Sequence, residues 1–211
     1  MRKVFSYNAD INKNAYMNWR TNLHEPIHNM NTIADGYFQN AILLAKSCLQ
    51  DNLDKKADVL IFPMLFSVNH AIELYEKSIC WSLNILLGNK SKFKENHDIR
   101  GIWLTVKQKI KEFGFVSDEG RGEKEFYRMI QNLEKYLQEI YTTIMDNDIN
   151  SAYYNIDFSR YPLNNHNEYH FYLKNCENVI IDIENFLNVI EDINDCLSRL
   201  ATYYYSLIVD N

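Results

Sequence analysis

Chain-breaking residues are scarce in this sequence, which has only six Gly and three Pro among 211 residues. So few breakers argue against a fold of many short strands joined by tight turns, and they favour a few long elements. Cysteine is also sparse, and none of the four forms a CxxC pair. We therefore expect reduced, buried, intracellular thiols rather than a disulfide framework.

Two kinds of targeting or spanning segment are missing as well. The first residues, MRKVFSYNADINKN, contain no apolar stretch of the kind that signal peptides carry. The longest apolar run, residues 59–68, is about half of what a membrane-spanning helix needs. We expect a cytoplasmic protein that does not associate with membranes.

Positive charge is in deficit, with 22 Lys and Arg against 28 Asp and Glu and a net charge of −6. A broad nucleic-acid-binding face is therefore not indicated, and we expect no DNA partner, although a local basic site remains compatible with this charge. Apolar residues make up 46% of the chain, which is enough for the core of one sizeable domain.

Apolar residues recur at spacings of three and four along most of the chain, which is typical of amphipathic helices. We predict an all-α fold, an antiparallel bundle of four to five long helices that forms one domain over residues 31–211. An irregular arm, residues 1–30, precedes it. The predicted helices cover residues 32–53, 56–87, 98–113, 123–146 and 172–209. The second should be the most buried, with Pro63 kinking it or marking its first turn.

The motif HEPIH, which runs from His24 to His28, matches the HExxH pattern of zinc peptidases. That chemistry needs both histidines one turn apart on a regular helix, whereas Pro26 separates them here and no amphipathic helix surrounds them. A ferritin-like site would need paired ExxH motifs, and the only ExxH is Glu25 to His28. We therefore expect no metal and no other cofactor.

Two histidine–carboxylate pairs lie inside predicted helices or at their starts. His70 and Glu73 share a helix face beside the apolar stripe, and His97 directly precedes Asp98, a plausible N-cap. Hydrogen-bonded core histidines that anchor a loop are the more frequent explanation of such pairs. We interpret these four residues as a structural polar core.

Arg160 and His166 lie in residues 147–167, the one long stretch without helical periodicity. An Arg and a His close together can cut RNA without metal, because His removes the 2′-OH proton while Arg stabilises charge on the phosphate. A structural alternative is that Arg160, flanked by Phe158 and Tyr161, turns inward and pairs with Glu73 on the most apolar helix.

Three short stretches resemble HEPN-like proteins. They are the H-x-x-E-L-x-x-K pattern from His70 to Lys77, the HDI helix start at His97, and the F-x-R-Y-P segment from Phe158 to Pro162. The order of elements over about residues 37–205 is similar too. The resemblance implies a bundle of antiparallel helices, usually dimeric. Many HEPN proteins are metal-independent ribonucleases of toxin and phage-defence systems, with an Arg and a His placed as Arg160 and His166 are, before the last core helix.

Two hypotheses about function follow from this resemblance. The first is a non-catalytic binding or immunity-type module of a bacterial toxin or defence system, with RNA or a cognate toxin or antitoxin protein as partner. The second is a metal-independent endoribonuclease that uses Arg160 and His166. We also predict a homodimer, because Tyr203, Tyr205 and Ile208 add apolar surface beyond the main stripe of the last helix.

Overall fold

The computed structural model describes residues 3–115, 121–147, 156–164, 166–174 and 178–210. The chain is all-α, with 70% helix and no strand among these residues. The predicted all-α helical bundle is therefore confirmed. The seven helices run as follows: α1 Pro26–Gln50, α2 Ala57–Leu86, α3 Ile99–Phe113, α4 Arg121–Met129, α5 Gln131–Asn147, α6 Phe171–Lys174 and α7 Ile183–Val209. The described residues also include two short 3-10 helices, η1 Ile11–Lys13 and η3 Ile156–Ser159.

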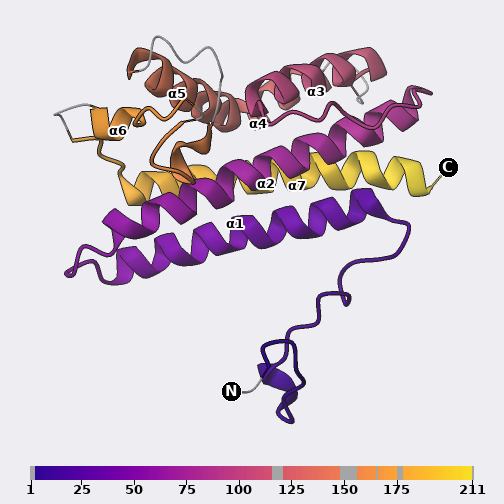
Figure 1. Ribbon diagram of the computed structural model, residues 1–211. Helices are drawn as coiled ribbons and strands as arrows, with labels where there is room; N and C mark the ends of the chain where they lie inside the picture. The colour runs from indigo at the N-terminus through magenta and orange to yellow at the C-terminus, as the bar shows by residue number, and fades with distance from the viewer. Residues whose placement is uncertain (1–2, 116–120, 148–155, 165, 175–177, 211) are drawn as a thin grey trace.

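Helix α2 lies at the centre of the bundle (Figure 1). It packs against α1 and α7 on one side and against α3 and η3 on the other. Nearly every side chain from Met64 to Asn84 is buried, so the prediction that this is the most buried helix is confirmed. Each fully buried large side chain, such as Ile72 or Leu83, stabilises the fold by roughly 1.5–3 kcal/mol.

Helix α2 is long and apolar enough to resemble a membrane-spanning helix. By length and composition α2 is the one helix within the described ranges that could cross a membrane, and half of its most apolar stretch is buried inside the bundle. That burial is compatible with the core helix of a soluble protein. Pro63 lies inside α2, beyond its first turn, so it does not mark the helix start.

Three helix boundaries differ from those predicted. Helix α1 begins at Pro26, within the stretch assigned to the arm, because the first position of a helix has no N–H bond for proline to lose. The helix predicted over residues 123–146 is broken near Ile130 into α4 and α5. The last long helix begins at Ile183 rather than near Tyr172, because the Asp182 side chain caps it by accepting the N–H groups of Glu184 and Asn185.

The connection after α2 runs back along that helix instead of leaving it. The Asn84 side-chain amide donates to the Lys92 carbonyl at 2.7 Å. The rings of Trp81 and Phe93 meet edge-on, with centroids 5.8 Å apart. The chain thus retraces several turns of α2 before α3 starts, and it delivers the residues that precede α3 to the middle of α2.

The N-terminal arm projects from the end of the bundle where α1 begins (Figure 1). Its last residues are tied to the first turns of α1. Asn22 and Asn29 exchange two hydrogen bonds of 2.8 Å, and the Thr32 hydroxyl donates to the Arg20 carbonyl at 3.1 Å. Residues 3–19 extend beyond this anchor.

Candidate functional site

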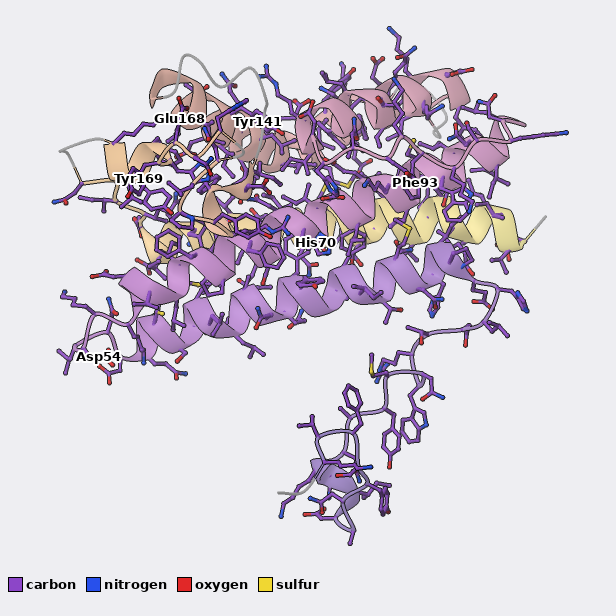
Figure 2. All side chains as sticks on the ribbon, in the orientation of Figure 1. Asp54, His70, Phe93, Tyr141, Glu168 and Tyr169 are labelled. Atoms are coloured by element: carbon purple, nitrogen blue, oxygen red, sulfur yellow. The ribbon has the colours of Figure 1, made fainter. Side chains whose placement is uncertain are left out.

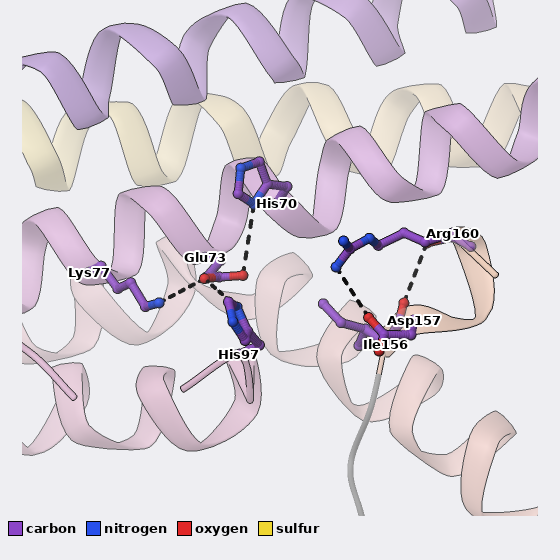
Figure 3. Close-up of polar contacts among 8 residues, drawn as sticks. His70, Glu73, Lys77, His97, Ile156, Asp157 and Arg160 are labelled. Carbon is purple, nitrogen blue, oxygen red and sulfur yellow. Dashed lines mark hydrogen bonds and ion pairs between the residues drawn. The ribbon is translucent and has the colours of Figure 1, made fainter. Parts of the chain in front are cut away.

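A buried carboxylate, Glu73, organises the polar residues at the middle of α2 (Figure 3). Lys77, one turn further along the same helix, donates to Oε1 at 2.7 Å. His97, delivered by the returning connection, places Nδ1 3.0 Å from the same oxygen. Nδ1 of His70 lies 3.8 Å from Oε2, which makes it an electrostatic neighbour rather than a hydrogen-bond partner. The structure therefore brings His70, Glu73 and His97 together, with Lys77 as the cation that the sequence reasoning overlooked.

The charge state of Glu73 follows from these neighbours. Burial acts to raise the pKa of its carboxyl, but the polar side chains of His70 and Lys77 beside it, and the charge of Lys77, lower the pKa to about 2. Glu73 is thus ionised over the whole physiological range, and it neutralises the almost fully buried ammonium of Lys77.

The imidazole ring of His97 is hydrogen-bonded to Glu73 through one nitrogen, and most of the ring is exposed to solvent. An ionised carboxylate can only accept, so Nδ1 of His97 carries the proton that it shares with Glu73. The side chain of His97 is nevertheless 78% exposed. A carboxylate that orients an imidazole and leaves Nε2 open to solvent is an arrangement suited to a general base. The hydrogen bond between His97 and Glu73 also fixes the start of α3 to α2.

Asp98 occupies the N-cap position of α3 without capping it, since its side chain makes no cap hydrogen bond. Its carboxylate accepts instead from the Tyr141 hydroxyl at 2.7 Å, which joins α3 to α5. Burial and the Asp98 carboxylate raise the pKa of Tyr141. A Cβ at Gly101 would lie 2.5 Å from an Asp98 carboxylate oxygen, so a larger residue there would require the Asp98 side chain to shift.

Glu76 is a buried carboxyl that the sequence reasoning missed. It is fully buried, and neither carboxyl oxygen has a hydrogen-bond partner within the described part of the chain. Burial, and then the charges of Glu73 and Asp98, raise its pKa well above the usual range. Glu76 follows Ile72 by four residues on an apolar face, and this spacing was the available signal.

The predicted ion pair between Glu73 and Arg160 is wrong. The guanidinium of Arg160 pairs with Asp157, at 3.3 Å from Oδ1, while Glu73 takes Lys77 (Figure 3). A lysine one turn along the same helix reaches the carboxylate without any loop having to be ordered, so it is the nearer cation. The Arg160 side chain remains 45% exposed.

Arg160 and His166 are placed on different parts of a hairpin-like turn. Leu163 and Tyr169 form an antiparallel bridge, and the His170 N–H donates to the Pro162 carbonyl at 3.3 Å. Arg160 precedes the base of this turn, whereas His166 lies near its tip. The backbone N–H of His166 is bound by the Asn164 side chain at 2.9 Å.

Comparison of the chain with protein-family models, curated proteins and solved structures gave no match. The likeness to HEPN-like proteins therefore rests on the residues of the three motifs. Their positions can be compared directly: His70, Glu73, Lys77 and His97 form one cluster, and Arg160 lies on the same side of α2 (Figure 3).

Aromatic rings connect Arg160 to that cluster. Its guanidinium lies 5.5 Å from the ring centroid of Phe66 and 5.1 Å from that of Tyr161. His70 stacks on Phe66 at 5.7 Å, and Tyr37 of α1 meets His70 edge-on at 4.7 Å. We call these five residues the Phe66 patch. All are at least partly exposed, and aromatic rings beside a guanidinium suit binding of a base, a phosphate or a partner side chain.

The HEPIH motif does not form a metal site. His24 has a left-handed backbone (φ 71°) outside α1, whereas His28 lies in the first turn, with Nε2 3.1 Å from the Arg20 carbonyl. Glu25 accepts from the Tyr205 hydroxyl at 3.2 Å. Among the described residues, no three His, Cys, Asp or Glu side chains are grouped so that they could hold a metal ion.

Proposed function

We propose that this chain is a HEPN-like helical module of a bacterial toxin or phage-defence system that binds a partner without catalysis, as an immunity-type protein does. The observation that carries the proposal is the placement of Arg160 and His166. The guanidinium is engaged by Asp157 and by two aromatic rings, and His166 sits near the tip of the turn. A general base must lie within hydrogen-bond reach of the proton that it removes, together with the group that stabilises the phosphate.

The Phe66 patch supports a binding role. It joins α1, α2 and the segment after η3, so one contact would bridge three parts of the fold. Arginine and tyrosine are enriched among residues that dominate binding energy, because both offer large rigid contact area with a polar end. The partner can be RNA or a cognate toxin or antitoxin protein.

Expression in a bacterial host tests the absence of catalysis. The wild-type chain should not arrest growth, and purified protein should leave total RNA intact in the presence of a chelator. The Arg160→Ala and His166→Ala variants should behave like the wild type in both assays. Growth arrest or RNA cleavage that either substitution abolishes would overturn the non-catalytic proposal.

Binding is tested with the protein encoded beside this gene, and with RNA as the competing partner. Arg160→Ala and Tyr161→Ala should each weaken binding at least about tenfold, the scale of a binding hot spot. Arg199→Ala is the matched control, since Arg199 is also an exposed arginine paired with an aspartate of its own segment, Asp195, at 3.0 Å. Equal affinities of the Arg160 and Arg199 variants would show that the Phe66 patch is not the binding surface.

The second candidate function is a metal-independent endoribonuclease. One observation favours it, with His97 rather than His166 as the general base. His97 has the carboxylate partner and the solvent-exposed edge that a general base needs. If the purified protein cuts RNA in EDTA, His97→Ala should lower the rate by roughly 100-fold or more, the usual scale for a lost general base. His166→Ala then separates the two assignments, because it should leave the rate unchanged if His97 is the base.

A further inference from the structure

A cavity of about 340 Å³ lies at the end of the bundle where α5, α6 and the start of α7 meet (Figure 1). Helix α6 begins two residues after Tyr169, which is labelled at this end of the molecule in Figure 2. Residues of α2 and η3 complete the walls. Small-molecule sites occupy roughly 300–1,000 Å³, so the cavity is large enough to hold a small organic ligand.

Aromatic rings from four different elements form much of the cavity wall. They belong to Tyr136 of α5, Phe158 of η3, Phe171 of α6 and Phe186 of α7. Each of these side chains is at most 7% exposed, so the surrounding core holds the rings in place. Phe158 and Phe171 pack against each other with centroids 5.4 Å apart. Most of the remaining wall is aliphatic, so the cavity is suited to the apolar body of a ligand.

The charge that faces the cavity is negative. Among the described residues that line it, the charged ones are Glu139 of α5 and Asp182, the N-cap of α7, and neither forms an ion pair with another described residue. The cap hydrogen bonds of Asp182 go to Oδ1, at 3.0 and 3.1 Å, which leaves Oδ2 available to a ligand. The charge of Glu139 reaches the wall, since it adds to burial in raising the pKa of Tyr136.

Three apolar residues just before α7 remain exposed beside the cavity. Val179, Ile180 and Ile181 line it, yet they are 45%, 83% and 36% exposed. Their backbone groups make no hydrogen bond within the described part of the chain. Clustered exposed apolar groups beside a cavity mark a place that a ligand covers, and a segment without hydrogen bonds can adjust to that ligand.

We propose that this cavity binds an organic ammonium ion with an apolar body. The negative faces of the aromatic rings attract the cation, and the aliphatic part of the wall accepts the body. The exposed carboxylate of Glu139 and Oδ2 of Asp182 add electrostatic attraction at the rim. A quaternary ammonium suits the site best, because it requires no hydrogen-bond acceptor among the rings.

Two other classes of ligand do not fit this cavity. A fatty acid or another organic anion would place its charge beside Glu139 and Asp182, with no Lys, Arg or His among the described lining residues to neutralise it. A metal ion would need a group of ligating side chains that the described residues do not provide. The proposal goes beyond the partner-binding role, because the Phe66 patch lies outside the cavity and is built from other residues.

Isothermal titration of the full chain with hexyltrimethylammonium tests the proposal. We expect saturable binding with a dissociation constant of about 1 mM or lower. Hexanoate, an apolar chain of similar length with the opposite charge, should bind at least about tenfold more weakly. Titration of the ammonium ion to about 10 mM without saturation, or equal affinity for hexanoate, would overturn the proposal.

Two substitutions that remove charge measure the contribution of the carboxylates. Glu139→Gln and Asp182→Asn should each raise the dissociation constant of the ammonium ion about threefold or more. Asparagine caps a helix as well as aspartate does, so the second change leaves the start of α7 intact. Glu184→Gln is the matched control, because Glu184 is an exposed carboxylate in the first turn of α7 that does not line the cavity. Equal effects of the Glu139 and Glu184 changes would contradict the assignment.

A larger side chain inside the cavity tests its location. Val189 lines the cavity from α7 and is partly buried, so Val189→Phe introduces a ring there. This change should weaken ammonium binding at least about tenfold, while the midpoint of thermal unfolding stays within about 5 °C of the wild type. If this variant does not fold, Ile140→Phe places a ring in the same cavity from α5. Undiminished binding by a folded variant would place the ligand elsewhere and overturn the proposal. None of these results bears on the Phe66 patch, which is measured with a different partner.

Discussion

Replacing the buried carboxyl of Glu76 by an amide should change how stability depends on pH. Folded Glu76 keeps its proton because burial and the charges of Glu73 and Asp98 raise its pKa well above the ordinary value of 4.5. The unfolded chain releases that proton above about pH 4.5. The folded state therefore binds one proton more than the unfolded state, and this group makes folding less favourable as the pH rises.

The magnitude follows from the proton count. One extra bound proton lowers the free energy of unfolding by about 1.4 kcal/mol for each pH unit, over the range in which folded Glu76 stays protonated. The Glu76→Gln variant has nearly the same shape and takes up no proton. Its stability relative to the wild type should therefore rise by about 1.4 kcal/mol per pH unit, whatever the fixed cost of burying the amide.

Urea unfolding of both proteins at pH 5.5, 6.5 and 7.5 measures this difference. Histidine and other titrations contribute equally to both chains and cancel in the comparison. The control is Glu112→Gln, because Glu112 lies on the exposed face of α3 and should give a constant offset. A constant offset for Glu76→Gln as well would refute the reasoning, since it would mean that the folded chain holds Glu76 ionised.

Three further substitutions test the contacts around the site by urea or thermal unfolding. Glu73→Gln should cost about 3 kcal/mol or more near neutral pH, because it strands the buried ammonium of Lys77. The wild type should lose the contribution of Glu73 as the pH falls from about 4.5 to about 2, since a lowered folded-state pKa stabilises only above that window. Tyr136→Phe should lower the free energy of unfolding by about 1–3 kcal/mol, because the buried Asn69 side chain loses the hydrogen bond of 2.9 Å that the Tyr136 hydroxyl donates to it. Arg160→Met should cost no more than about 1 kcal/mol, the range of an exposed ion pair, and a larger loss would restore a structural role for this arginine.

Helix positions could be predicted from the sequence because the apolar stripes are long and regular. Boundaries failed where two local signals competed. Val179 continues the apolar spacing of the last helix, so the spacing predicts an earlier helix start. The helix begins only after Asp182, because the side chain of Asp182 caps it by accepting the N–H groups that follow. The break near Ile130 has no such signal. Ile130 is fully buried, and no Gly or Pro lies nearby, so no residue type in the sequence indicates that the helix breaks here.

The polar cluster was predictable only in part. The spacing of His70 and Glu73 places them on one helix face. The same spacing rule places Lys77 one turn beyond Glu73, so the ion pair between Lys77 and Glu73 could have been predicted from the sequence. No spacing could show that the connection after α2 folds back to bring His97 to Glu73, because that contact spans 24 residues. The position of His166 near the tip of a turn likewise depends on pairing that residue types do not specify.

The central place of α2 implies that the molecule does not open uniformly. Because α1, α3, α7 and η3 all pack on α2, its amide protons can exchange with solvent only when most of the bundle comes apart. Helix α4 packs mainly on α5 and reaches α3 through the ring of Phe126 on Trp103. It can therefore detach in a local opening of much lower free energy. Hydrogen exchange should accordingly divide the chain into a slow unit centred on α2 and a fast unit at α4, with the arm exchanging fastest in the absence of a partner.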